Sequence, residues 1–180
     1  MIKRTLFIHA GGPKTGSSAL QNALELNAAK LKNLGFEYAH KVGTSSKYQI
    51  TSGNGIPLFE LLNGVSLANP WLNNTNAQNA TDLLINNVKD DELDSLLLSY
   101  FEDMPNAICS SEFFSELSNA AWSHLIQALQ RNEISFKVIY YVRDALPFYV
   151  SAYDQTIKRH GQFHTLEEFA KQQNWKHTKL

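Results

Sequence analysis

Two short stretches of the sequence combine residue types that bind tetrahedral oxyanions. The first, GGPKTGSS at residues 11–18, follows an apolar, β-prone run at 5–10 and precedes leucines and alanines at helical spacing. A glycine-rich turn between a strand and a helix aims backbone N–H groups at one point, which suits phosphate or sulfate. Lys14 adds a cation on the turn itself. The competing interpretation is an ordinary Gly-Pro turn before a helix.

The second stretch begins where the strongest strand pattern, residues 136–142, ends in Arg143. Ser151 follows eight positions later, about two turns into the expected helix. The planar guanidinium of an arginine suits a phosphate group, and a hydroxyl beside it adds a further donor. The alternative is a structural ion pair between Arg143 and Asp144 or a distant glutamate.

The first stretch departs from a Walker A loop, which reads G-x-x-x-x-G-K-[ST]. Gly11 and Gly16 have the right separation, but Ser17 stands where the lysine belongs. The order PKTGSS at 13–18 closely resembles the 5′-phosphosulfate loop of sulfotransferases that use 3′-phosphoadenosine-5′-phosphosulfate (PAPS). The strand, arginine and serine at 136–151 resemble the 3′-phosphate signature of the same family, in its bacterial type.

The resemblance implies roles for these residues. Lys14 would stabilise charge on the oxygen that bridges phosphate and sulfate, and Arg143 and Ser151 would bind the 3′-phosphate. The 5′-phosphosulfate would lie in the turn, whose cofactor-binding residues would be Pro13, Lys14, Thr15, Gly16, Ser17 and Ser18. The cofactor would be PAPS, its product would be the 3′,5′-bisphosphate PAP, and no metal would be required.

Transfer to a hydroxyl or amine also needs a general base. Glu112 and His40 are the two candidates, each at the expected carboxyl end of a strand, and we favour Glu112 because its strand at 107–111 is the better defined. The segment Ser110-Ser111-Glu112 also resembles bacterial sulfotransferase-like sequences. Glu112 would otherwise be a helix N-terminal glutamate, and His40 a surface loop histidine. We expect His9 to be a core or supporting residue.

The expected elements alternate as strands and helices, which predicts an α/β fold. It would have three layers, α/β/α, with a parallel sheet as the central layer. The resemblance narrows this to the P-loop NTPase-like sulfotransferase fold. We expect a first helix over 17–34 whose apolar stripe packs on the sheet, a stop at Gly35, and a loop-rich insertion at 41–80 on the acceptor side. A short helix at 56–62 lies within that insertion. Residues 119–130 and 165–175 read as further helices.

Length and composition set broad limits. A chain of 180 residues predicts one domain over 1–180, and 43% hydrophobic with 18% charged residues is typical of a globular protein. The net charge of −1 gives no general affinity for nucleic acid, and no apolar run is long enough to span a bilayer. The one cysteine, Cys109, is expected in the core, and the absence of a signal-peptide pattern predicts a cytoplasmic protein.

The sequence thus predicts a sulfotransferase acting on a small-molecule, carbohydrate or lipid acceptor. Members of that family usually continue into a glycine-rich segment that residues 161–180 do not match, so the chain is either a short member or a fragment. Two alternatives remain open: a P-loop nucleotide kinase or NTPase, and a non-catalytic nucleotide-binding remnant of the fold.

Overall fold

The computed structural model describes residues 3–12, 15–38, 53–64, 89–161 and 165–172. The chain divides into two compact units, Met1–Tyr141 (unit 1) and Val142–Leu180 (unit 2), and each is described by itself. The single domain that the sequence predicts over 1–180 stays a prediction. Most of the loop-rich stretch at 41–80, including its expected role on the acceptor side, lies outside the described residues.

Unit 1 is built on a four-stranded sheet in the order β2-β3-β1-β4, and every described strand pair is parallel. The strands are β1 (Arg4–Gly11), β2 (Phe36–Glu37), β3 (Asn106–Ser111) and β4 (Ile134–Tyr141). Ala10 near the end of β1 is in register with Ser111 of β3 and Tyr140 of β4, so these strands end at one edge. The predicted α/β class with a parallel sheet is confirmed.

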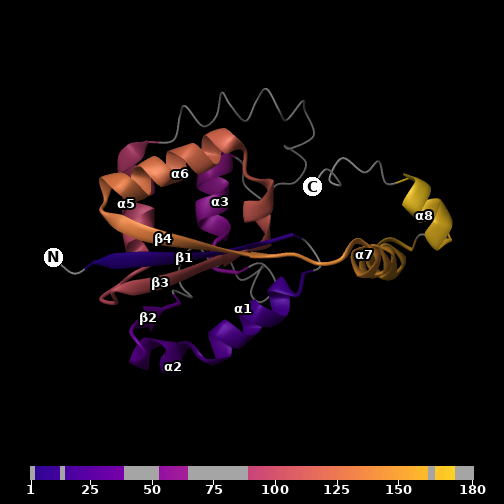
Figure 1. The fold of residues 1–180 in the computed structure, drawn as a ribbon, viewed down its shortest axis with the longest axis horizontal. Helices are drawn as coiled ribbons and strands as arrows, with labels where there is room; N and C mark the ends of the chain where they lie inside the picture. Colours follow the sequence, from indigo (N-terminus) through magenta and orange to yellow (C-terminus); the bar gives the residue numbers. More distant parts are fainter. Residues whose placement is uncertain (1–2, 13–14, 39–52, 65–88, 162–164, 173–180) are drawn as a thin grey trace. The chain divides into compact units, whose positions relative to one another are not determined.

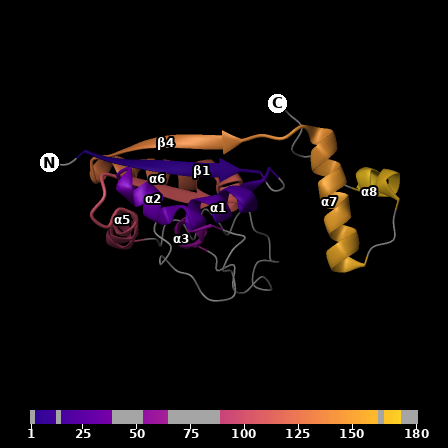
Figure 2. The ribbon, with the colours of Figure 1, turned by 90° about the horizontal axis from the view of Figure 1, so that it is seen from below.

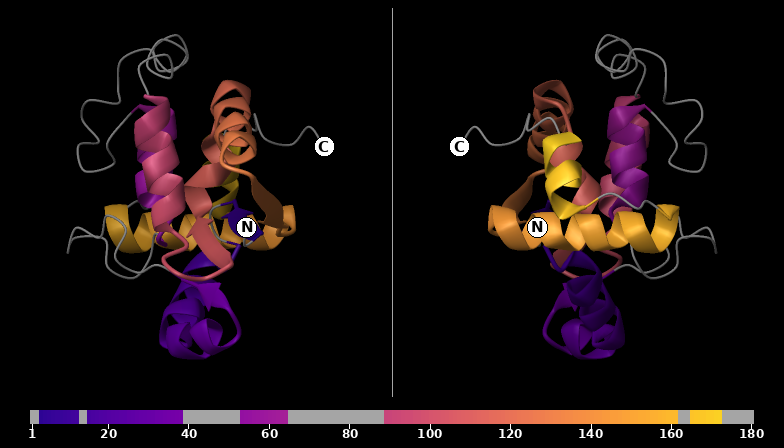
Figure 3. Two further views of the ribbon diagram at one scale, coloured as in Figure 1. Left: turned by 90° about the vertical axis from the view of Figure 1, so that its left-hand side faces the viewer. Right: turned by 90° about the vertical axis from the view of Figure 1, so that its right-hand side faces the viewer.

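Helices lie on both faces of this sheet (Figures 1 and 3). On one face are α1 (Ser17–Leu26) and α2 (Ala28–Asn33). On the other are α3 (Ile56–Asn63), α5 (Asp90–Ser99) and α6 (Asn119–Arg131), and a short 3₁₀ helix, η2 (Glu112–Glu116), follows β3. The helices expected at 56–62 and 119–130 are therefore confirmed, and the unit has three layers.

The prediction of one helix over 17–34 was wrong in two respects. The helix breaks at Asn27, whose side-chain amide donates to the Ala23 carbonyl oxygen at 2.8 Å and so ends α1. The buried residues of α1 are Ser17 and Gln21 rather than its leucines, and Leu26 and Leu34 are exposed. Ser17 and Gln21 face the sheet because each makes a hydrogen bond there, Ser17 with Glu112 and Gln21 with Ser110. The expected stop at Gly35 is confirmed by its φ of +82°.

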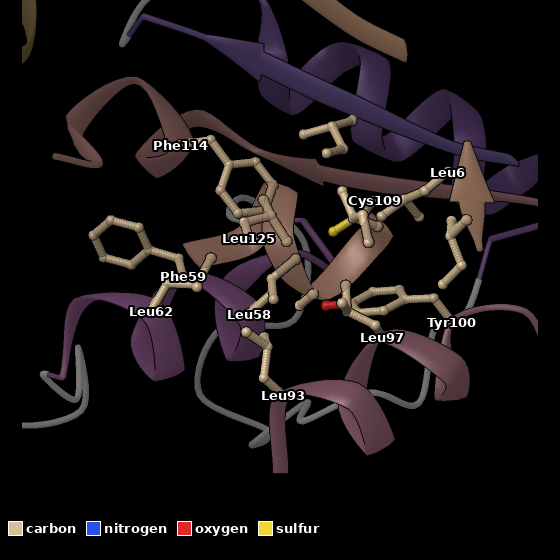
Figure 4. Close-up of a cluster of buried hydrophobic side chains, with 14 of the residues drawn as sticks. Leu6, Leu58, Phe59, Leu62, Leu93, Leu97, Tyr100, Cys109, Phe114 and Leu125 are labelled. Carbon is tan, nitrogen blue, oxygen red and sulfur yellow. The ribbon is translucent and has the colours of Figure 1, made fainter. Parts of the chain in front are cut away.

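The apolar core of unit 1 lies between the sheet and the helices α3, α5 and α6. Figure 4 shows Leu58 of α3, Leu97 of α5 and Tyr100, which directly follows α5. These side chains lie around Leu6 of β1 and Cys109 of β3. Each fully buried large side chain contributes about 1.5–3 kcal/mol. Cys109 is fully buried, as expected, and burial raises the pKa of its thiol to about 12.

A tight turn at Gly53-Asn54-Gly55 completes the edge of β3 that β2 leaves unpaired. β2 is in register only with Asn106 and Ala107. Beyond them, the Asn54 side chain donates to the Ile108 carbonyl oxygen and accepts from the Ser110 N–H, both at 2.8 Å. The Gly55 N–H donates to the Ser110 carbonyl oxygen at 2.9 Å. This turn therefore takes the place of a neighbouring strand where β3 reaches the edge of the sheet.

Unit 2 contains α7 (Ala145–His160) and α8 (Leu166–Gln172), which pack together (Figure 2). The rings of Tyr153 and Phe169 lie 5.7 Å apart, and Phe169 is buried. A capping box precedes α8: the Thr165 N–H donates to the Glu168 carboxylate at 2.8 Å, and the Glu168 N–H donates to the Thr165 hydroxyl at 3.3 Å. This confirms the expected helix start at Thr165.

Candidate functional site

The turn between β1 and α1 is shaped by two glycines and a threonine. β1 ends at Gly11, and the Thr15 hydroxyl donates to the Gly12 carbonyl oxygen at 2.7 Å. Gly16 takes a φ of +91°, and its carbonyl oxygen accepts the first helical hydrogen bonds, from Ala19 and Leu20. The N-terminus of α1 carries no acidic side chain in its first turn, so the helix dipole favours an anion there. Pro13 and Lys14 lie outside the described residues.

Glu112 reaches this turn from the neighbouring strand. It follows β3 directly, and one of its carboxylate oxygens accepts a hydrogen bond from the Ser17 hydroxyl at 3.0 Å. Ser17 is buried and Glu112 is half-buried. Two residues predicted for different roles, cofactor binding and catalysis, are thus in direct contact although 95 positions separate them.

This contact has chemical consequences for both residues. A hydroxyl has one proton to donate, so Ser17 orients the Glu112 carboxylate and its side chain cannot at the same time donate to a bound anion. The remaining lone pairs of Glu112 are suited to accept a proton from an incoming hydroxyl or amine. The other candidate base, His40, lies outside the described residues.

A buried polar cluster lies beneath the turn. His9 and Ser110 are register partners on β1 and β3, and the His9 Nδ1 lies 2.8 Å from the Ser110 Oγ. The Gln21 side-chain amide, on α1, donates to the same oxygen at 3.2 Å. His9 is buried, as the expectation of a core or supporting residue requires, and burial lowers the pKa of its imidazole.

Sequence reasoning missed the roles of Ser110 and Gln21. The available signal was that both are polar residues placed where a buried β-strand and the inner face of a helix were expected. Spacing along the chain does not show that they meet, because their contact depends on how α1 packs against β3.

The two residues predicted for the 3′-phosphate both belong to unit 2. Arg143 lies just before α7 and is exposed, and Asp144 occupies the N-cap position of that helix. Ser151 is half-buried within α7. Among the predicted site residues, then, the structure brings Ser17 and Glu112 together in unit 1 and describes Arg143 and Ser151 separately from them.

Within the described ranges, no group of three or more His, Cys, Asp and Glu side chains is arranged to hold a metal ion. In the same part of the chain, no helix combines the length and apolarity needed to cross a membrane. Comparison of the chain with protein-family models, with curated proteins and with solved structures finds no match.

Proposed function

We propose that this protein is a PAPS-dependent sulfotransferase that moves a sulfuryl group to a hydroxyl or amine of an acceptor. The observation that carries the proposal is the contact between Ser17 and Glu112 at 3.0 Å, which places a carboxylate beside a glycine-rich helix N-terminus. In an open parallel sheet, ligands bind outside the carboxyl ends of the strands, and both residues belong to that edge.

The donor site follows from the proposed roles of the turn and of the second motif. Lys14 and the backbone amides of residues 15–18 would neutralise the 5′-phosphosulfate, much as a phosphate-binding loop does in phosphoryl transfer. Arg143 and Ser151 would bind the 3′-phosphate, which distinguishes PAPS from nucleotides that lack it.

In the reaction, the acceptor oxygen or nitrogen attacks the sulfur atom, and the bond from sulfur to the bridging oxygen breaks. PAP leaves with the added negative charge on its 5′-phosphate, where Lys14 would stabilise it. Glu112 takes the proton of the acceptor as the new bond forms. Ser17 keeps the carboxylate directed toward the turn through its hydrogen bond.

The test is sulfuryl transfer from sulfur-labelled PAPS to a panel of sugars, phenols and lipids, with release of free sulfate measured in parallel. We expect wild-type turnover with at least one acceptor, and a loss of about 10²–10³-fold in Lys14→Ala, the range typical of removing one group that stabilises transition-state charge. Lys171→Ala, which removes an exposed lysine of α8, is the matched control and should leave turnover unchanged. Full turnover in Lys14→Ala would contradict the proposed role of the loop.

A further inference from the structure

Two buried side-chain atoms of the polar cluster beneath the turn, the His9 Nε2 and the Gln21 Oε1, have no hydrogen-bond partner among the described residues. His9 is only 2% exposed, and its Nδ1 lies 2.8 Å from the Ser110 Oγ. Its second ring nitrogen, Nε2, is fully buried and makes no hydrogen bond within the described part of the chain. Buried polar atoms of native proteins nearly always have a partner, so this one points to a ligand.

The contacts of Ser110 are compatible with a proton on the His9 Nε2. The Gln21 amide donates to the Ser110 hydroxyl, and the hydroxyl proton can in turn donate to the His9 Nδ1. The Nδ1 is then an acceptor, and the Nε2 carries the ring proton. Turning the Gln21 amide over would reverse these roles, and in either arrangement the His9 Nε2 and one end of the Gln21 amide remain without partners, so the protonated Nε2 is part of the inference that is tested below.

The Nε2 faces the glycine that ends β1. A methyl group added to Gly11 would lie 3.6 Å from the His9 Nε2 and 2.8 Å from the Thr15 Oγ1. Because Gly11 has no side chain, the end of β1 and Thr15 can lie this close to the edge of the imidazole. The ring of Tyr141 packs edge-on against the imidazole, with centroids 4.8 Å apart, and so holds its plane.

We infer that His9 is a further anion-binding residue of this turn, whose Nε2–H donates a hydrogen bond to an oxygen of the bound tetrahedral oxyanion. The inference rests on the proposed function for the identity of that anion, the phosphosulfate end of the donor. Burial keeps the imidazole neutral, so it contributes a directed donor rather than a charge. Ser110 and Gln21 act on the anion only through His9, as positioning residues.

Two substitutions of His9 test the roles of its two ring nitrogens separately. The side-chain carbonyl oxygen of asparagine can take the place of the histidine Nδ1 and accept from Ser110, so His9→Asn keeps a partner for Ser110 and loses the donor to the anion. His9→Gln places its amide nitrogen near the Nε2 and keeps that donor instead. We expect His9→Asn to bind PAP and inorganic pyrophosphate at least about tenfold more weakly than the wild type, and His9→Gln to stay within about threefold.

A second measurement uses the unaltered chain and separates ligand binding from folding. Nitrogen NMR of protein with ¹⁵N-labelled histidine, with His9→Asn to assign the signal, should show His9 protonated at Nε2. That signal should shift when PAP or pyrophosphate is added. A purely structural His9 would give no such shift, and both substitutions would then lower stability without changing affinity.

Each outcome decides between the two proposals. If PAP binds while the Nε2 signal and both variants' affinities are unchanged, the role of His9 is wrong and the sulfotransferase proposal stands. If pyrophosphate binds and shifts the signal but PAP does not bind, the role of His9 stands and the PAPS proposal fails. Binding of neither probe to the wild type overturns both.

Discussion

The two strand–turn–helix segments of this protein, β1 to α1 and β4 to α7, differ in how their residues are held. In the first, Ser17 contacts Glu112 and Gln21 contacts Ser110, across 95 and 89 positions of sequence. In the second, Thr156 of α7 donates to the Tyr153 carbonyl oxygen and Lys158 pairs with Asp154, contacts that span only three and four positions.

The strands differ in the same way. On β1, Leu6, Ile8 and Ala10 are buried, whereas on β4 every residue after Ile134 is exposed. The first motif is therefore built into the core of unit 1, and changes beneath it should alter both stability and function. Changes in the second motif, whose residues are exposed or half-buried, should affect ligand binding more than stability.

Glu112→Gln should lower turnover by about 10²–10⁴-fold, because a neutral amide cannot take the acceptor's proton. Its carbonyl oxygen still accepts from Ser17, so the free energy of unfolding should change little. Single-turnover transfer from PAPS measures the effect, and Glu116→Gln, an exposed glutamate of η2, is the control. Normal turnover in Glu112→Gln would show that another residue is the general base, and His40 would be the next candidate.

Gly53→Ala should destabilise unit 1 by about 3 kcal/mol, the sum of left-handed backbone strain and overpacking. Gly53 has a φ of +73°, and an added methyl would lie 2.0 Å from the Ser110 carbonyl oxygen, which the Gly55 N–H also binds. Gly35→Ala is the matched control: its φ is +82° but the nearest atom would be at 3.9 Å, so only the strain of about 1–2 kcal/mol remains.

Chemical labelling of the single cysteine, Cys109, measures this loss of stability in unit 1. Cys109 is fully buried and its thiol is held protonated by a pKa near 12, so it should react with a thiol reagent only when unit 1 opens. Labelling should be faster in Gly53→Ala than in Gly35→Ala at equal reagent concentration. Equal labelling rates would show that the turn at 53–55 does not support β3.

Arg143→Ala should weaken PAP binding by about 10–100-fold, the value of a charge-assisted hydrogen bond, and leave 5′-AMP binding unchanged. Because Arg143 is exposed, the unfolding midpoint should stay within experimental error of the wild type. Calorimetric titration with both nucleotides measures the difference. An equal loss for PAP and 5′-AMP would argue against a 3′-phosphate contact at Arg143.

The smallest effect is a pH dependence of stability from His9. Burial lowers the imidazole pKa below its ordinary value of 6.5, so the unfolded chain binds the proton more readily. Stability from this group is present above pH 6.5 and lost as the pH falls below it, by up to about 1.4 kcal/mol per pH unit. Urea unfolding between pH 7 and pH 5 should show a shallower decline in His9→Asn, and parallel declines would contradict the assignment.

Much of this fold is readable from local patterns. The apolar run before the glycines predicts β1, the small residues after Pro105 predict β3, and Gly35 marks a helix end through its backbone freedom. The contact of Glu112 with the turn also follows in outline, since both stand at carboxyl ends of strands expected to be parallel.

Other features depend on contacts that no local pattern encodes. The leucine spacing at 20–34 predicts a buried stripe, but α1 buries Ser17 and Gln21 because Glu112 and Ser110 offer them hydrogen bonds. The apolar run at 136–142 predicts a strand equally well whether it is buried or, like β4, largely exposed. Asn54 takes the place of a strand beside β3 only because β2 is short.

The most direct test of the central proposal is calorimetric titration of the wild type and Lys14→Ala with PAP and with ATP and Mg²⁺. A sulfotransferase turn should bind PAP saturably at one site, bind ATP much more weakly, and lose at least about tenfold in PAP affinity without Lys14. Preference for ATP and Mg²⁺, or no binding of PAP, would contradict it.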